Sequence, residues 1–111
     1  MTVAFELGGR KFVALNGGPQ YAFSEAVSFV VDCETQDEVD RFWDALTADG
    51  GQEGPCGWCK DRFGLSWQIV PDALPRLLTD PDREKAQRVM ACMMQMKKLD
   101  VAALEAAAVG T

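Results

Sequence analysis

The 111-residue sequence contains no histidine and no long apolar run. Histidine is the commonest general base near neutral pH and the commonest transition-metal ligand, so catalysis here would depend on carboxylates, thiols, hydroxyls, amides or a borrowed group. The longest apolar runs are far shorter than the roughly 20 residues of a membrane-spanning helix, and no basic and apolar leader opens the sequence. We therefore expect one cytoplasmic domain with no membrane partner.

Basic residues are also scarce, with 11 Lys and Arg against 17 Asp and Glu and a net charge of −6. The few bases are scattered or paired with acids, so no basic face is available to neutralise phosphates. We expect no nucleic-acid partner.

The four cysteines are Cys33, Cys56, Cys59 and Cys92, and in the cytoplasm they would be reduced. Cys56 and Cys59 have the spacing of redox dithiols and of half zinc sites. A redox dithiol needs its first thiol at a helix N-terminus, whereas a hairpin turn follows here. If 56–60 is a strand, the two thiols point to opposite faces and lie about 10 Å apart, too far for a disulfide or a shared metal. We interpret both as small apolar side chains.

The order of elements is typical of an α+β fold, with mostly antiparallel strands, one crossover helix and a C-terminal helical tail. Val3, Phe5 and Leu7 alternate before a Gly8-Gly9 turn, which favours a β-hairpin. The expected elements are a hairpin within 1–16, a strand centred on 29–31, a helix over 36–48, strands over 56–60 and 66–70, a short helix over 74–78, a long helix from 81 to about 98, and a last short helix after 100.

Residues that start helices precede three of these segments. Thr35 and Glu38 stand at capping-box spacing before the first helix. Asp80 followed by Pro81 has the pattern of an N-cap and first helical residue, and Asp100 is the expected cap of the last helix.

Two groups of large side chains admit both a packing role and a binding role. The methionines of the long helix are interpreted as packing or subunit-contact residues. Trp58 and Trp67 flank the DRFG turn, and each could pack on the sheet or form a pocket wall.

Four segments carry a resemblance to a known family: ALNGGP (14–19), SFVVDCETQDEVDRFWDAL (28–46), GPCGWCKDRFGLSWQIVP (54–71) and DPDREKAQRVMACMMQMKKLDVAALE (80–105). Together they resemble the PhnB-like family of the glyoxalase/bleomycin-resistance (vicinal oxygen chelate) superfamily. Members of this bacterial-type family often carry the label 3-demethylubiquinone-9 3-methyltransferase. The resemblance runs in order over essentially the whole chain.

The resemblance implies two βαβββ modules whose curved sheets face each other around a cavity. Within a single domain over 1–111, the hairpin of 1–16 corresponds to the end of an incomplete first module. Residues 27–70 correspond to a second βαββ module, and 72–109 form the helical tail. The missing β-α unit leaves a sheet edge and an apolar face to be covered, so we expect a homodimer in which each copy completes the other. The alternative is a truncated gene product with a structural role alone.

The resemblance also indicates where a cavity would be lined. Metal-dependent members carry His, Gln or Glu ligands on the first and last strands of each module. Gln68 matches the last-strand position, whereas Ala26 and Ser28 stand near the first-strand position, and one amide cannot hold an ion. We therefore expect a cavity without metal or cofactor, lined by Ser28, Gln68 and an aromatic wall including Trp58, with Asn16 as a further candidate.

Two classes of function remain open at this stage. The first is binding of a small organic molecule, as in the drug-sequestering members of the superfamily. The second is an enzyme, either the methyltransferase of the label or one that uses Cys56 or Cys59 as nucleophile with Asp61 or Glu53 nearby. A typical methyl-donor site needs a Gly-rich loop in a doubly wound sheet, and the sequence shows neither. The sequence identifies no catalytic residue and no ligand.

Overall fold

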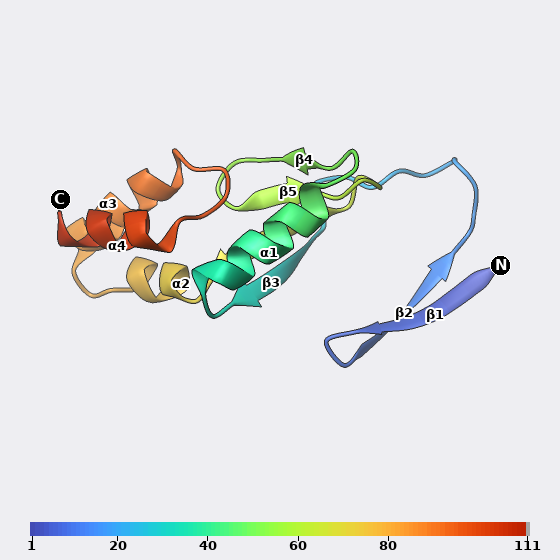
Figure 1. Ribbon diagram of the computed structural model, residues 1–111, viewed down its shortest axis with the longest axis horizontal. Helices are drawn as coiled ribbons and strands as arrows, with labels where there is room; N and C mark the ends of the chain where they lie inside the picture. The colour runs from blue at the N-terminus through green and yellow to red at the C-terminus, as the bar shows by residue number, and fades with distance from the viewer. Residues whose placement is uncertain (111) are drawn as a thin grey trace.

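The structure is a computed structural model, and it describes residues 1–110. The α+β architecture is confirmed, with two separate sheets followed by helices (Figure 1). The elements are β1 (Thr2–Leu7), β2 (Arg10–Leu15), β3 (Ser28–Cys33), α1 (Gln36–Thr47), β4 (Gln52–Glu53), β5 (Trp58–Lys60), β6 (Ser66–Pro71), α2 (Ala73–Leu78), α3 (Arg83–Met93) and α4 (Val101–Val109).

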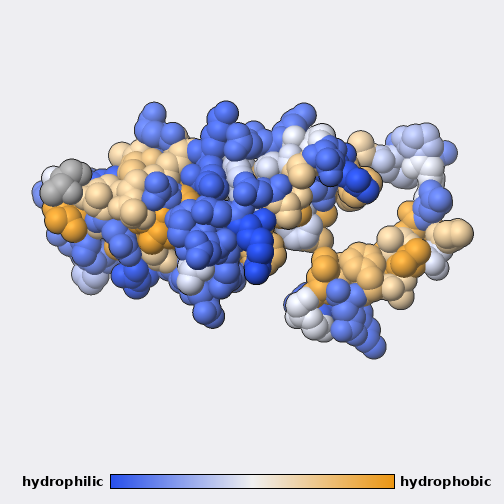
Figure 2. Space-filling model, in the orientation of Figure 1, coloured by the Kyte–Doolittle hydropathy of each residue, from blue (hydrophilic) through white to orange (hydrophobic). Residues whose placement is uncertain are grey.

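The N-terminal hairpin of β1 and β2 forms as expected around Gly8 and Gly9, which both have positive φ angles. Phe5 lies opposite Phe12, and their rings stack with centroids 5.5 Å apart. Both strands remain largely exposed. Figure 2 shows apolar side chains gathered along this hairpin, away from the body of the molecule.

The second sheet has the strand order β3-β6-β5-β4, with β3 parallel to β6 and the other pairs antiparallel. The crossover between the parallel strands is α1, which lies across one face of this sheet (Figure 1). Thr35 caps α1, since its Oγ1 accepts a hydrogen bond from the Glu38 N–H. Val39 and Trp43 of α1 pack on Cys33, Cys59 and Ile69 of the sheet.

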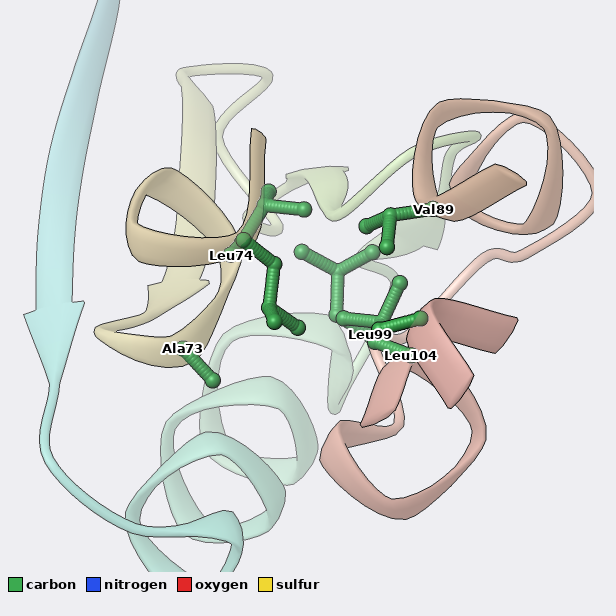
Figure 3. Packing of buried hydrophobic residues seen from close by; sticks show 7 residues of the cluster. Ala73, Leu74, Val89, Leu99 and Leu104 are labelled. Atoms are coloured by element: carbon green, nitrogen blue, oxygen red, sulfur yellow. The ribbon is translucent and has the colours of Figure 1, made fainter. Parts of the chain in front are cut away.

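The three C-terminal helices form a second hydrophobic cluster at the other end of the molecule from the hairpin (Figure 1). Figure 3 shows Leu74, Val89, Leu99 and Leu104 converging in this cluster. Leu99 belongs to no helix and is fully buried. The chain between α3 and α4 therefore forms part of the core.

Gly57 is the point at which the sheet meets the helical tail. Its φ is +85°, and an added Cβ would lie 2.9 Å from Leu99 Cδ1 and 3.1 Å from the Ile69 carbonyl oxygen. Both the backbone conformation and the close contact therefore favour glycine.

Two element boundaries differ from the sequence-based expectations. The strand expected over 56–60 begins only at Trp58, because Cys56 and Gly57 have positive φ angles that a strand does not adopt. The long helix ends at Met93 and not near residue 98. The chain then turns, and the carbonyls of Met96 and Lys97 accept hydrogen bonds from the N–H groups of Cys56 and Gly57.

Two further differences concern the N-cap of α3 and an additional strand. The N-cap of α3 is Asp82, which accepts hydrogen bonds from Glu84 and Lys85, whereas Asp80 accepts from the Asp82 N–H. The two-residue strand β4 was not expected, and it completes a βαβββ order from β3 to β6. The caps at Thr35 and Asp100 are confirmed.

The molecule is elongated, with extents of 53 × 26 × 24 Å and a radius of gyration of 16.2 Å. A compact chain of this length would have a radius of gyration of about 13 Å. The hairpin accounts for the excess, since it projects from the rest of the chain (Figure 1). None of the helices formed by residues 1–110 is long and apolar enough to cross a membrane.

Candidate functional site

The face of the second sheet opposite α1 carries most of the residues that could form a site. Alternation along the strands places Cys33, Cys59 and Ile69 under α1 and their neighbours on the opposite side. We call this opposite side the open face. It comprises Ser28 and Val30 of β3, Trp58 and Lys60 of β5, and Ser66 and Gln68 of β6.

The structure brings three of the four expected site residues together on the open face. The side-chain amide of Gln68 donates a hydrogen bond from Nε2 to Ser28 Oγ at 2.9 Å. Trp58 lies directly opposite Gln68 on the neighbouring strand. Asn16 lies elsewhere, at the end of the hairpin, where its N–H donates to the Met1 carbonyl.

A cavity of about 370 Å³ adjoins the open face beside β4 and β5. Its wall includes Pro55, Cys56, Trp58, Lys60 and Ser66. This volume is within the range of pockets that hold small organic molecules. Trp58 therefore lines this cavity, whereas Gln68 is its cross-strand neighbour and is not part of the wall.

One charged pair borders this cavity. Lys60 Nζ lies 2.6 Å from Glu25 Oε1, which reaches the cavity from the segment between β2 and β3. The hydrogen bond from Lys60 and the positive charge of this residue lower the pKa of Glu25 below its ordinary value. The Glu25 side chain is 66% exposed, so solvent also stabilises its charged form.

The buried hydroxyl of Ser66 is the clearest chemical feature of the cavity wall. Ser66 is 1% exposed, and its Oγ has no hydrogen-bond partner within the described chain. Ser66 pairs across the sheet with Lys60 of β5 on one side and with Ser28 of β3 on the other. A buried hydroxyl without a partner is destabilising unless something else satisfies it. The sequence reading missed Ser66, although its spacing of two residues from Gln68 could have placed it on the same face.

The two thiols of the CGWC segment have different environments. Cys56 lies in the turn before β5, is partly exposed and lines the cavity, with its Sγ 3.8 Å from Met94 Sδ. Cys59 is 2% exposed beneath α1, and burial, followed by the charge of Asp61, raises its pKa to about 11. All four cysteines are free. Cys59 is also part of the cavity lining, but Cys56 is the more exposed residue of the pair.

The acids suggested as partners for a thiol have other roles. Asp61 accepts hydrogen bonds from the N–H groups of Phe63 and Leu65 and from Trp67 Nε1. Glu53 Oε1 accepts a hydrogen bond from Trp43 Nε1 at 2.8 Å. Both carboxylates thus stabilise local structure.

A larger groove of about 720 Å³ lies between the hairpin turn, β3 and α1. Three rings line it in series, with centroid separations of 5.7 Å between Phe12 and Phe29 and 5.4 Å between Phe29 and Trp67. Ser28 also lines this groove. It offers mainly apolar contacts.

The positions at which the family resemblance would place metal ligands do not carry a suitable donor set. Gln68 and Ser28 are hydrogen-bonded to each other, and a hydroxyl with one amide is a poor donor set for a transition metal. Within residues 1–110, no three His, Cys, Asp or Glu side chains come together as potential ligands.

Comparison with known proteins identifies a family and two solved structures, each of which matches a little under two thirds of the chain. A family model described as 3-demethylubiquinone-9 3-methyltransferase matches residues 1–70. The solved structure of a Bacillus cereus PhnB protein that carries the same methyltransferase name is similar at 26% identity, with a TM-score of 0.56 over 64% of each chain. Protein PA1353 from Pseudomonas aeruginosa shares the fold at 20% identity, with a TM-score of 0.50 over 65% of this chain and 64% of the other. The chain thus aligns with less than two thirds of either relative. No curated protein matches it.

Proposed function

The chain belongs to the 3-demethylubiquinone-9 3-methyltransferase family of PhnB-type, glyoxalase-like proteins, and from this premise we propose that it binds a small organic molecule in a metal-free cavity and forms a homodimer through its hairpin. The observation that carries the proposal is the cavity beside β5, where an unpartnered buried hydroxyl and an indole ring share one wall. Such a mixture of apolar surface with a few polar groups is characteristic of small-molecule sites.

The metal-free part of the proposal rests on the Ser28–Gln68 hydrogen bond. The amide nitrogen of Gln68 is directed at Ser28, and the two side chains therefore satisfy each other without an ion. A ligand at this face would be held by hydrogen bonds and apolar contact.

The homodimer is proposed because apolar side chains of the hairpin are exposed. Val13 and Leu15 are 69% and 72% exposed, and Phe5 is 41% exposed on the other face. A two-stranded hairpin is only marginally stable by itself in water, and apolar patches of this kind usually mark interaction surfaces. A second copy that packs on the hairpin would cover these side chains and enclose the neighbouring groove.

An enzymatic role is the second candidate, and Cys56 is the observation that favours it. Its thiol lines the cavity and could act as a nucleophile toward a bound molecule. Methyl transfer, which the family description names, would require a donor pocket in addition. The second sheet contains one parallel pair, β3 with β6, and this arrangement differs from the doubly wound sheet of a typical methyl-donor site. Binding therefore ranks first.

Thermal-shift measurements test the proposal directly. Small aromatic acids, amides and alcohols should include compounds that raise Tm, and Trp58→Ala should abolish the shift, whereas Phe63→Ala, at an exposed ring outside both cavities, should retain it. Zn²⁺, Ni²⁺ and Mn²⁺ should leave Tm unchanged. Stabilisation by a divalent metal that Gln68→Ala removes would refute the metal-free site, and a complete lack of organic ligands would refute binding.

A further inference from the structure

The geometry points to a carboxylate as the recognised group: we propose that the cavity beside β5 binds small apolar monocarboxylates, and that the Glu25 carboxylate occupies the ligand's place in the free protein. This inference rests on the proposed function, since it names the ligand class of the same cavity.

The donors for a carboxylate come from two adjacent strands. Lys60 and Ser66 are direct cross-strand partners and project from the same face, so their Cβ atoms lie about 5 Å apart. Lys60 offers an ammonium group, and the hydroxyl of Ser66 can donate one further hydrogen bond. The two oxygens of one carboxylate could accept from both groups. At present only Lys60 has a partner, because Ser66 Oγ is unpaired within the described residues.

Glu25 already shows that a carboxylate fits beside Lys60. Its Oε1 lies 2.6 Å from Lys60 Nζ, and the residue is part of the cavity wall. Glu25 belongs to the irregular segment between β2 and β3. The neighbouring residues Ser24 and Ala26 are joined by a local hydrogen bond, from the Ala26 N–H to Ser24 Oγ. An ion pair this exposed stabilises little, so a ligand with better geometry can displace it.

The rest of the cavity wall limits the part of the ligand that carries the carboxylate. Trp58 and Pro55 supply apolar surface to the same wall, and Gln52 and Glu53 of β4 supply polar groups at its other side. The volume of about 370 Å³ limits the ligand to a small molecule. A flat apolar body with one carboxylate would combine contact with Trp58 and hydrogen bonds to Lys60 and Ser66.

Calorimetric titration with benzoate and its neutral isostere benzamide tests this assignment. The wild-type protein should bind benzoate about tenfold more tightly than benzamide, because only benzoate can form a charge-assisted hydrogen bond with Lys60. Lys60→Met should remove the preference, and Ser66→Ala should weaken benzoate binding several-fold. Glu25→Gln should strengthen benzoate binding about three- to tenfold, because the competing carboxylate is gone.

The exposed pair of Arg76 and Glu105 provides the matched control. These side chains lie 3.6 Å apart on the helical tail, so Glu105→Gln should leave benzoate binding unchanged. Glu25→Gln changes an exposed side chain and should fold normally, and circular dichroism would check this.

Equal affinity for benzoate and benzamide, or no gain in the Glu25→Gln variant, would overturn the inference. If neutral compounds still raise Tm of the wild-type protein but not of Trp58→Ala, small-molecule binding in the cavity would remain supported. If no organic compound shifts Tm of either the wild-type or the Glu25→Gln protein, small-molecule binding itself fails, and the inference fails with it.

Discussion

The side-chain amide of Gln36 is hydrogen-bonded to the main chain next to Val101, which lies far from it in sequence. Gln36 Oε1 accepts from the Val101 N–H at 2.7 Å, and its Nε2 donates to the Leu99 carbonyl at 3.0 Å and to Asp40 Oδ1 at 3.0 Å. One side chain thus joins the start of α1, in the sheet unit, to the start of α4, in the helical tail.

Gln36→Leu should reduce the free energy of unfolding by about 1–3 kcal/mol, because it leaves partly buried main-chain groups without partners. Urea denaturation measures this loss. Gln95→Leu, at an exposed position between α3 and α4, should have little effect. Equal stability of the wild-type and Gln36→Leu proteins would show that water replaces the amide at no cost.

Gly57→Ala should be more damaging than Gly64→Ala, although the two glycines have nearly the same φ, +85° and +88°. At Gly64 an added methyl group meets no atom within 4 Å, so only the backbone cost of about 1–2 kcal/mol applies. At Gly57 the methyl group also meets Leu99 and the Ile69 carbonyl. Thermal unfolding of both variants checks the order, and similar losses would contradict the close contact.

Ser66→Ala should leave stability unchanged or raise it by about 1 kcal/mol in the absence of ligand, since it removes a buried hydroxyl that has no partner among residues 1–110. Ser28→Ala should instead lower stability by about 1 kcal/mol, because it removes the acceptor of the Gln68 amide. Chemical denaturation distinguishes the two. A loss in Ser66→Ala as large as that in Ser28→Ala would mean that Ser66 is hydrogen-bonded in solution.

Alkaline pH should destabilise the protein partly through Cys59. Burial raises the pKa of this thiol to about 11 from an ordinary value of 9.0, so the unfolded chain releases its proton first. The stability contributed by the buried neutral thiol is fully present below pH 9 and is lost as the pH rises to about 11. Cys59→Ala should therefore show a flatter decline in stability over this interval, measured by denaturation at several pH values. A decline as steep as in the wild-type protein would assign the effect to other groups, including Cys33, whose pKa burial also raises.

The hairpin variants Phe5→Asp and Val13→Asp should dissociate the proposed homodimer, because each places a charge on an apolar face. Sedimentation velocity would report the change from dimer to monomer. Val109→Asp, at a residue 76% exposed at the end of α4, should leave the dimer intact. A wild-type protein that sediments as a monomer at high concentration would refute the dimer.

The sequence was most informative where local chemistry determines structure. Thr35 and the spacing of Val39 and Trp43 predicted α1 to within one residue, and Asp100 correctly predicted the last helix. The start of β5 and the end of α3 were wrong for one shared reason. Both are set by hydrogen bonds from Cys56 and Gly57 to Met96 and Lys97, a contact between distant segments that no local pattern encodes.

The candidate site likewise combines residues that a local pattern could identify with one that it could not. The family resemblance pointed to Ser28 and Gln68, and strand alternation, which puts them on one face, could have added Lys60 and Ser66. Glu25 could not be found this way, because it comes from an irregular segment whose path depends on the fold around it.

The separation of the core into two clusters also has a consequence for folding. The helices of the tail contact one another across short stretches of chain, whereas the parallel pairing of β3 with β6 must close a loop that contains α1, β4 and β5. Short loops close at lower entropic cost and faster than long ones. We therefore expect the α3 and α4 amides to gain protection from hydrogen exchange first during refolding. The open face, with the cavity beside it, would then assemble against a tail that has already formed.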